Sequence, residues 1–569
     1  MSVTRWLLAL LVVSAAWPAV AYAQEDQGQD RFFADKTEPE DAPEDATLFQ
    51  GSLTSTSFYY RETGSIAAAL SGGAVGVENA SKLDRLFTEL RARLDARHIS
   101  GGAYDFHVDA RARLTPEQKF DDGYTPAADW GTQVGAYGHN EYDIRELYLR
   151  RYGVRTDLTF GRQYVPELAT VKIDGIRFTY SKTDVWNVVG FAGFYPNRAS
   201  RSVLDDYPKA APAMAGGAPG TRILPVAGGL GGAYRMEKMY GSLGAVAIMP
   251  LAKEQLPGGP RDEQPRVFVT AQGYWRRSSK LDIYHFVVLD LYGSNATDRG
   301  ELQGTIAKIP LTNFSVGVSY KPNTNLRVNL AVNRVDTETL NVVAQTKLQD
   351  PGATPLNIVQ NNVEVQRMSQ QSARLGVSAA FKQQRFELSA SALARSRPEI
   401  SLTTADGATD LTIPAAEALE LTLQATDRRS YKGHRISGQY TAILGRGNTN
   451  LYRTDANVVR LNASREVKDG MGEYDINLGY VASKDENRGQ VCGGTPMDAF
   501  TSCFGTSKIN TISLSGLLFY RPVVNWFVVV SASAASQGIT ILDAGATPQG
   551  VNQPRILILT GFLRIARRF

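Results

Sequence analysis

Charged and apolar residues alternate along residues 86–114, and the charged set is the part of this sequence best suited to chemistry. Guanidinium and carboxylate groups on one surface attract, orient or exclude charged solutes, and a low-dielectric wall focuses their field. The apolar members include Leu86, Leu90, Leu94, Phe106 and Val108. The charged residues expected to face a common aqueous interior are Glu89, Arg91, Arg93, Asp95, Arg97, Asp105, Asp109, Arg111 and Arg113.

This period of two predicts β-strands, because successive side chains of a strand point to opposite faces. Two strands are expected, separated by the short break at Ile99–Gly102. One face of each strand is almost wholly apolar, whereas the other is dense with Arg and Asp. A strand that separates lipid from water has this pattern, so the segment predicts the second and third strands of a transmembrane β-barrel.

The arginines of this hairpin have two roles that the sequence leaves open. A ladder of Arg would guide anionic or hydroxyl-rich solutes along the lumen. Alternatively, charges of mixed sign on neighbouring strands would neutralise each other and brace the wall. Later polar positions on the same parity, such as Arg327, Asn462 and Asn477, are sparser and are expected to be simply solvated.

The N-terminal residues 1–23 have the composition of a secretory signal peptide. Arg5 supplies the positive charge, residues 6–13 the apolar core, and Ala21-Tyr22-Ala23 the cleavage site. Residues 24–47 are acidic and contain proline, which predicts a flexible periplasmic tail. Binding of a periplasmic protein partner and a plain solvated leader are both open for this tail. The barrel is expected over residues 48–569.

From residue 48 onward, strand-like segments are joined alternately by short turns and long connections. Long connections are expected at 115–140, 196–226, 251–264, 336–368, 396–415, 483–507 and 537–554. Bacterial barrels have short periplasmic turns and long external loops, with an even number of strands. The expected fold is therefore all-β, a large antiparallel up-and-down barrel of about 18–22 strands. Such a barrel would lie in the cell outer membrane, in contact with lipid and lipopolysaccharide.

Three short motifs resemble a stretch of large bacterial porins. They are residues 145–151 (RELYLRR), 158–163 (LTFGRQ) and 173–178 (IDGIRF). The series is similar to that of alginate-export and of carbohydrate- or phosphate-selective barrels. The resemblance implies that Arg162 and Arg177 face the pore. The final alternating segment ends on Phe569 and resembles the C-terminal assembly signal of outer-membrane proteins, although Arg567 stands where that signal carries an apolar or aromatic residue.

Other kinds of site find little support in the sequence. Cys492 and Cys503 are expected to form a disulfide, since the protein is exported. The five histidines are scattered without metal-ligand spacing, so no metal site or cofactor is expected. The formal net charge of +4 is near neutral and gives no case for nucleic acid. No catalytic motif stands out, so an enzyme is not expected.

Two classes of function fit these features. The first is a porin-like channel that passes small polar solutes, anionic or saccharide-like, by diffusion through a charged lumen. Long connections folded inward would constrict this channel, and residues 196–226 and 336–368 are the candidates. The second is an outer-membrane barrel of an envelope machine for polysaccharide secretion or surface motility, which acts through protein partners. A receptor coupled to TonB is disfavoured, because strand-like alternation begins soon after the expected cleavage site.

Overall fold

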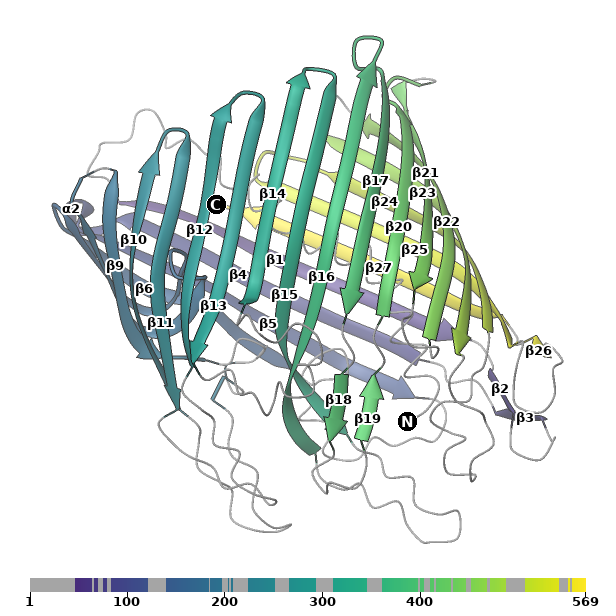
Figure 1. The fold of residues 1–569 in the computed structure, drawn as a ribbon, viewed down its shortest axis with the longest axis horizontal. Coiled ribbons are helices and arrows are strands. Elements are labelled where there is room, and N and C mark those ends of the chain that lie inside the picture. The colour runs from purple at the N-terminus through teal and green to yellow at the C-terminus, as the bar shows by residue number, and fades with distance from the viewer. Residues whose placement is uncertain are drawn as a thin grey trace, which may run out of the picture.

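In a computed structural model, the chain forms one closed antiparallel sheet (Figure 1). Cys492 and Cys503, the signal peptide, and residues 24–46 of the acidic tail lie outside the residues that the structure describes. The described residues are 47–63, 66–69, 75–78, 83–120, 140–183, 185–196, 203, 206–207, 224–250, 266–292, 311–344, 361–397, 400–403, 410–413, 416–430, 433–446, 452–467, 471–487, 507–541, 551–552 and 555–569.

Twenty-two strands make up the barrel, at the upper end of the range expected from the sequence. The strands are β1 (Leu48–Thr63), β4 (Leu83–His98), β5 (Tyr104–Phe120), β6 (Glu141–Tyr152), β7 (Thr156–Val165), β8 (Val171–Ser181), β9 (Trp186–Phe194), β10 (Pro225–Met236), β11 (Met239–Pro250), β12 (Arg266–Ser278), β13 (Leu281–Tyr292), β14 (Leu311–Asn323), β15 (Leu326–Ala344), β16 (Asn361–Phe381), β17 (Phe386–Arg397), β20 (Ala416–Asp427), β21 (Arg435–Arg446), β22 (Tyr452–Val467), β23 (Gly472–Asn487), β24 (Ser507–Tyr520), β25 (Trp526–Ile541) and β27 (Ile556–Arg568). The alternating segment at 86–114 lies in β4 and β5, which are the second and third barrel strands, as expected.

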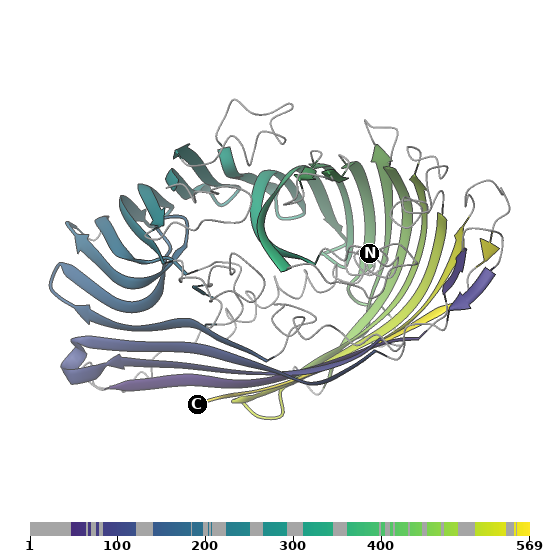
Figure 2. The same ribbon diagram turned by 90° about the horizontal axis from the view of Figure 1, so that it is seen from below.

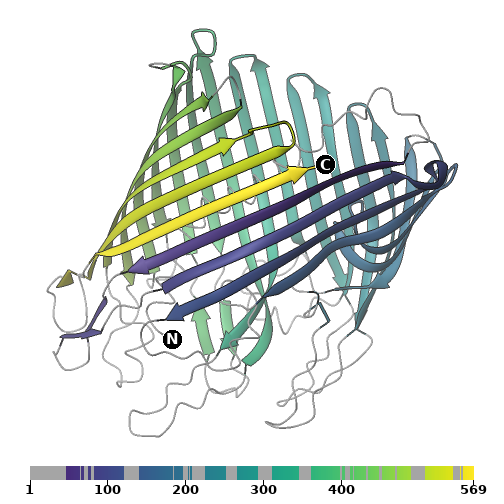
Figure 3. The same ribbon diagram turned by 180° about the vertical axis from the view of Figure 1, so that it is seen from behind.

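The barrel closes where its first and last strands meet (Figure 3). β1 pairs with β4 on one side and with β27 on the other. The backbones of Gly51 and Phe569 exchange two hydrogen bonds of 3.0 and 3.1 Å, which extend this seam to the last residue. Closure leaves no unpaired edge, and an open edge in hydrocarbon would expose unsatisfied backbone groups.

Short and long connections lie at opposite ends of the barrel (Figure 1). Connections of two to seven residues join β4 to β5, β6 to β7, and every second pair thereafter. The opposite end carries the long connections, together with two of five residues that join β7 to β8 and β21 to β22. Several of the long connections are shorter than the sequence predicted, because the strands run further. β15 continues to Ala344 and β16 starts at Asn361, inside the expected connection 336–368. Small hairpins β2 (Ile66–Ala69) with β3 (Val75–Glu78) and β18 (Ile400–Thr403) with β19 (Asp410–Ile413) also lie within connections, and β26 (Val551–Asn552) adds two residues beside β25.

The outer face of the barrel is apolar and exposed. Leu86 and Leu90 on β4 are 41% and 43% exposed, and Leu230 on β10 is 65% exposed. Side chains of the opposite parity point inward, where the charged residues of β4 and β5 pair with one another. The described residues include one short helix, α2 (Ile99–Gly102), and none long and apolar enough to cross a membrane. A closed barrel with an exposed apolar exterior and a polar interior is the architecture of a bacterial outer-membrane protein.

Two hairpins depart from the cylindrical wall on the side of the long connections. Figures 1 and 2 show the far ends of β15 and β16 leaving the wall and curving over the interior. The tip of the β7–β8 hairpin also turns inward, where Leu168 is fully buried against the inner wall. The barrel therefore has an oval outline and a partly occupied lumen (Figure 2).

Candidate functional site: the lumenal wall and its inward hairpin

Arg91 and Asp109 form the central ion pair of the β4–β5 wall. Arg91 Nε donates to Asp109 Oδ1 at 2.9 Å, and Arg91 Nη2 donates to Asp109 Oδ2 at 2.7 Å. The two side chains are 15% and 7% exposed. Arg91 faces Arg111 directly across the strand pair, so the two-pronged bond to Asp109 also offsets the repulsion between like charges.

Arg111 and Arg113 on β5 share carboxylates with their neighbours on both sides. Glu89 on β4 lies 3.4 Å from Arg111 Nη1 and 3.1 Å from Arg113 Nη2. Glu141 and Asp143 on β6 lie 3.4–3.9 Å from the same two guanidinium groups. The charges thus form a network across three strands. This arrangement favours bracing of the wall over an uncompensated ladder of positive charge.

Sequence reasoning missed the carboxylate-bound His107 in this wall. Its Nδ1 lies 2.5 Å from Asp95 Oδ1, and its Nε2 lies 3.1 Å from Glu146 Oε2. The ring also stacks on Tyr148 with centroids 5.0 Å apart. His107 occupies the polar parity between Asp105 and Asp109, and that position was the available signal.

The remaining predicted wall residues of β4 and β5 lie nearer the turn end. Arg93 Nε is 3.5 Å from Asp95 Oδ2, and 40% of the Arg93 side chain is exposed. Arg97 is exposed at the end of β4. Asp105 accepts a hydrogen bond of 2.6 Å from the Tyr152 hydroxyl and one of 3.0 Å from the His98 amide. Asp105 therefore fastens the turn.

Arg162 on β7 is held by three acceptors. Its Nε and Nη2 donate to Asp174 at 2.6 Å each, and its Nη1 donates to Asp206 at 2.5 Å and to the Ile144 carbonyl at 3.0 Å. The Tyr207 hydroxyl donates to Asp174 Oδ2 at 2.7 Å. Burial and this hydrogen bond raise the pKa of Tyr207, so the hydroxyl keeps its proton and remains a donor. Arg162 thus acts as the centre of a buried cluster.

The connection between β7 and β8, residues 166–170, folds into the lumen. Leu168 is fully buried. Its Cδ2 occupies the space that a side chain at Gly231 of β10 or at Gly244 of β11 would fill. Gln272 on β12 donates to the Pro166 carbonyl at 2.5 Å. Glu167 accepts a 2.7 Å bond from Arg177, the second residue that the porin resemblance placed in the pore.

An apolar cluster fixes this tip against the inner wall. Its members on the tip are Val165, Leu168, Ala169, Val171 and Ile173, and its members on the wall are Val189, Phe191, Ala227, Val246, Ile248, Phe268 and Val288. The wall members have the opposite parity to exposed Leu230 and Leu243, so they face the lumen. Among the described residues, the short connection at 166–170 thus lies in the lumen, whereas most of 196–226 and the connection 345–360 fall outside the described residues.

Glycines on three strands permit the hairpin to bend. Gly161 faces Gly175, which in turn faces Gly193. Gly161 has φ +124°, and a Cβ there would lie 2.2 Å from the Leu147 carbonyl. Pairing of β7 with β6 and of β8 with β9 ends close to this row, at Arg162 and Asp174. Beyond this row of glycines, the tip of the β7–β8 hairpin no longer pairs with β6 or β9.

Replacing Gly161 with alanine is expected to destabilise this bend. The side chain would require a strained backbone and would meet the Leu147 carbonyl, and strain of this kind costs about 1–3 kcal/mol before the clash is counted. Urea titration of the purified barrel would then show a lower midpoint. Gly376→Ala is the control, because Gly376 has ordinary φ and more than 3.7 Å to the nearest atoms outside its own strand. Equal midpoints for both variants would contradict this role of Gly161.

A segment of the β9–β10 connection lies in the space that the bent hairpin leaves. The Val203 amide donates to the Tyr142 carbonyl on β6 at 2.6 Å. Asp206 is 2% exposed and binds Arg162 on β7, and Tyr207 packs edge-on against Phe194 of β9 at 6.4 Å. These contacts link β6 with β9 across the gap in the wall.

The opposite part of the inner wall, on β20–β25, carries mostly neutral polar groups. Thr422 and Thr441 are hydrogen-bonded at 3.1 Å, and Asn462 Nδ2 donates to Asn477 Oδ1 at 2.7 Å. The inward hydroxyl and amide residues here are Thr422, Gln424, Gln439, Thr441, Asn462, Asn477, Ser513, Ser515, Ser531 and Ser533. The lumen therefore has one side dense in paired charges and another on which hydroxyl and amide groups outnumber the charged residues Glu420, Arg460 and Asp475.

Within the described residues, no group of three or more His, Cys, Asp and Glu side chains is arranged to hold a metal ion.

No family model matches the chain, and no curated protein matches it. Solved structures of outer-membrane proteins are similar over most of the chain. OccAB1 of Acinetobacter baumannii shares 8% identity with a TM-score of 0.39, and covers 94% of this chain and 100% of its own. OccK8 (OprE) of Pseudomonas aeruginosa shares 11% with a TM-score of 0.35, and covers 92% and 98%. OmpT of Vibrio cholerae shares 9% with a TM-score of 0.30, and covers 94% and 100%. The assignment of this protein to the outer-membrane β-barrels rests on its own closed barrel and exposed apolar exterior.

Proposed function

We propose that the protein is an outer-membrane channel for small polar solutes, rather than an enzyme. The observation that carries the proposal is the inner face of the closed 22-strand barrel, which is lined by charged, amide and hydroxyl groups. An aqueous lumen is the environment in which such a face is stable, and barrels of this size enclose a wide interior. The long connections would face the cell exterior and the short turns the periplasm.

Neutral, hydroxyl-rich solutes fit the wall better than simple anions do. Carboxylates bind five arginines of β4, β5, β7 and β8, which offsets most of their attraction for a passing anion; these are Arg91, Arg111, Arg113, Arg162 and Arg177. Thr441, Asn462 and Asn477 lie on a wall of exchangeable donors and acceptors, which can replace the water around a sugar hydroxyl. We therefore favour saccharide-like cargo. The inward tip at 166–170 narrows the path.

Planar-bilayer recording of the purified protein tests the channel itself. We expect steady ion current with weak selectivity between anions and cations, because the wall charges are paired. A barrel that inserts and never conducts would exclude the proposal. Strong anion selectivity would instead favour the ladder of Arg and weigh against saccharide-like cargo.

Liposome swelling with a neutral disaccharide tests the cargo. The double variant Asn462→Leu with Asn477→Leu removes two inward amides at similar volume. We expect disaccharide entry to fall about five- to 30-fold, because each of the one or two hydrogen bonds lost is worth about 1 kcal/mol. Ion conductance in bilayers should stay near that of the unmodified protein and serves as the control. Unchanged swelling would show that this wall does not contact the solute.

A further inference from the structure

A row of three tyrosines crosses the inner wall next to the inward tip. Strand register places Tyr240 of β11 opposite Tyr274 of β12, and Tyr274 opposite Tyr284 of β13. Gly317 of β14 ends the row, opposite Tyr284. The strands are about 5 Å apart, so the three side chains are immediate neighbours.

Strand parity places this row on the lumenal face. Phe286 lies two residues from Tyr284 on the same face of β13 and packs against the apolar cluster that fixes the tip. Gln272 lies two residues from Tyr274 on β12 and donates to the Pro166 carbonyl of the tip at 2.5 Å. The row therefore begins where the tip ends, on the side of the short turns.

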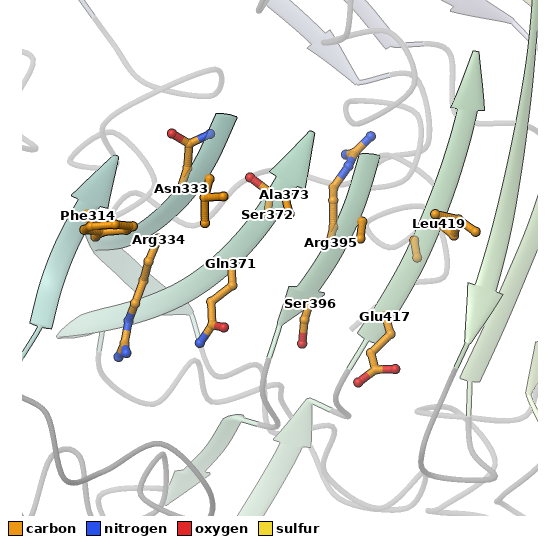
Figure 4. Close-up of a pocket in the computed structure, with 13 residues that line it drawn as sticks. Phe314, Asn333, Arg334, Gln371, Ser372, Ala373, Arg395, Ser396, Glu417 and Leu419 are labelled. Carbon is orange, nitrogen blue, oxygen red and sulfur yellow. The ribbon is translucent and has the colours of Figure 1, made fainter. Parts of the chain in front are cut away.

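The strands β14 and β15 continue the same lumenal face. Successive residues of a strand point to opposite faces, as Asn333 and Arg334 of β15 do in Figure 4. Asn333 accepts a hydrogen bond of 2.6 Å from the Ser315 hydroxyl, and Ser315 pairs with Phe286. Gly317 follows Ser315 by two residues and therefore also faces the lumen.

The ring of Tyr284 lies against the wall and keeps one face open. A Cβ added at Gly317 would occupy the space of the Tyr284 atoms Cε1 and Cζ, so the ring covers this glycine. The Tyr284 side chain is nevertheless 45% exposed, and its parity directs that exposed surface into the lumen. The lack of a side chain at Gly317 thus allows the ring to lie flat and to present a face to a passing solute.

One carboxylate and two guanidinium groups border this ring. Asp282 lies two residues along β13 on the same face, about 7 Å away. Arg276 Nε donates to Asp282 Oδ1 at 3.1 Å, and the Arg276 guanidinium lies 5.7 Å from the centre of the Tyr274 ring. Arg327 Nε donates to Ser319 Oγ at 3.2 Å, and Ser319 pairs with Asp282 across β13 and β14.

We propose that Tyr284 is the stacking surface of a saccharide-binding subsite, with Asp282 and Arg276 binding the hydroxyl groups of the sugar. A pyranose has an apolar face of C–H groups, which the electron-rich face of an aromatic ring attracts, and a rim of hydroxyls that carboxylate and guanidinium groups can bind. Asp282 and the ring face repel a free anion, whereas Arg276 and Arg327 repel a free cation. This inference rests on the proposed function, because the saccharide must enter the lumen to reach Tyr284.

Saturation-transfer NMR of the full-length barrel, titrated with cellobiose in a detergent without a sugar headgroup, tests the subsite. Tyr284→Ala is expected to weaken binding about two- to twelvefold, which is the range for one aromatic contact. Tyr284→Phe keeps the ring and should bind as the unmodified protein does. Tyr320→Ala is the matched control, because Tyr320 on β14 is 46% exposed on the outer face.

A second probe isolates the stacking contact. Sorbitol carries hydroxyl groups but has no ring face, so it should bind the unmodified barrel more weakly than cellobiose does. Equal binding of the two probes would overturn the stacking role of Tyr284. Unchanged cellobiose binding in Tyr284→Ala, or an equal loss in Tyr284→Ala and Tyr284→Phe, would overturn the subsite.

Liposome swelling with cellobiose separates the subsite from the channel. Disaccharide entry through a barrel that shows no binding dependent on Tyr284 would overturn the subsite and leave the channel standing. Binding that depends on Tyr284 in a barrel that admits no disaccharide would overturn the channel instead. Each variant is first required to give the folded band on an unheated SDS gel, so that a loss of binding reports on the subsite.

Discussion

Replacing Leu168 with alanine is expected to release the tip of the β7–β8 hairpin and to raise the conductance of the open channel. Leu168 is fully buried against Gly231 and Gly244, so truncation leaves a cavity in the only apolar cluster that fixes the tip among the described residues of these strands. Buried Leu-to-Ala changes cost about 2–5 kcal/mol. The lost free energy weakens the packing of the tip against the inner wall, whereas the barrel itself keeps its backbone hydrogen bonds. Single-channel recording should show larger and noisier current steps.

Leu230→Ala provides the control for this measurement. Leu230 lies on β10 close to the same glycines, but it points outward and is 65% exposed. The chemical change is identical, whereas the lumen is untouched, so its current should match that of the unmodified barrel. If Leu168→Ala and Leu230→Ala gave the same current, the tip would not limit passage.

Replacing Arg162 with alanine is expected to destabilise the barrel by about 3–5 kcal/mol, since it strands buried carboxylates without their partner. Asp206 has a side chain that is 1% exposed, and Asp174 would lose two charge-assisted hydrogen bonds. The temperature at which the folded band on an SDS gel converts to the unfolded band should fall. Adding Asp206→Asn should restore part of the loss, because it removes one uncompensated charge.

Arg150→Ala is the matched control for Arg162→Ala. Arg150 pairs with Asp157 at 2.6 Å, but the two side chains are 39% and 22% exposed. Exposed pairs contribute about 0–1 kcal/mol. A similar loss of stability in both variants would show that burial does not set the importance of Arg162.

The architecture could be predicted from sequence because a barrel repeats one rule in every strand. Most outward positions are apolar and most inward positions are polar, so the alternation over residues 86–114 was sufficient to place β4 and β5. The strand ends were harder to predict. β15 and β16 pair through residues 336–344 and 361–369, where polar composition suggested a connection, because backbone pairing continues beyond the apolar band.

The partners of the site residues could be predicted only in part. The pairing of Arg91 with Asp109 follows from strand neighbours, and bracing was one of the two roles left open for it. The bonds of Arg162 to Asp206 and of Gln272 to Pro166 join residues far apart in the chain. They depend on a hairpin that leaves the wall, and the local signal of that bend is the row of Gly161, Gly175 and Gly193.

The pairing of β1 with β27 has a consequence for how the chain folds. Phe58 meets Phe562 across this seam, so the final contact joins the two most distant parts of the barrel. Contacts of such high sequence separation are slow to form, because the entropy of closing the intervening chain must be lost first. A chain truncated before β27 would leave the edges of β1 and β25 without a strand partner in hydrocarbon. The barrel can therefore close only when nearly the whole chain is present. Until β27 pairs with β1, the cell must protect the unpaired strands from aggregation.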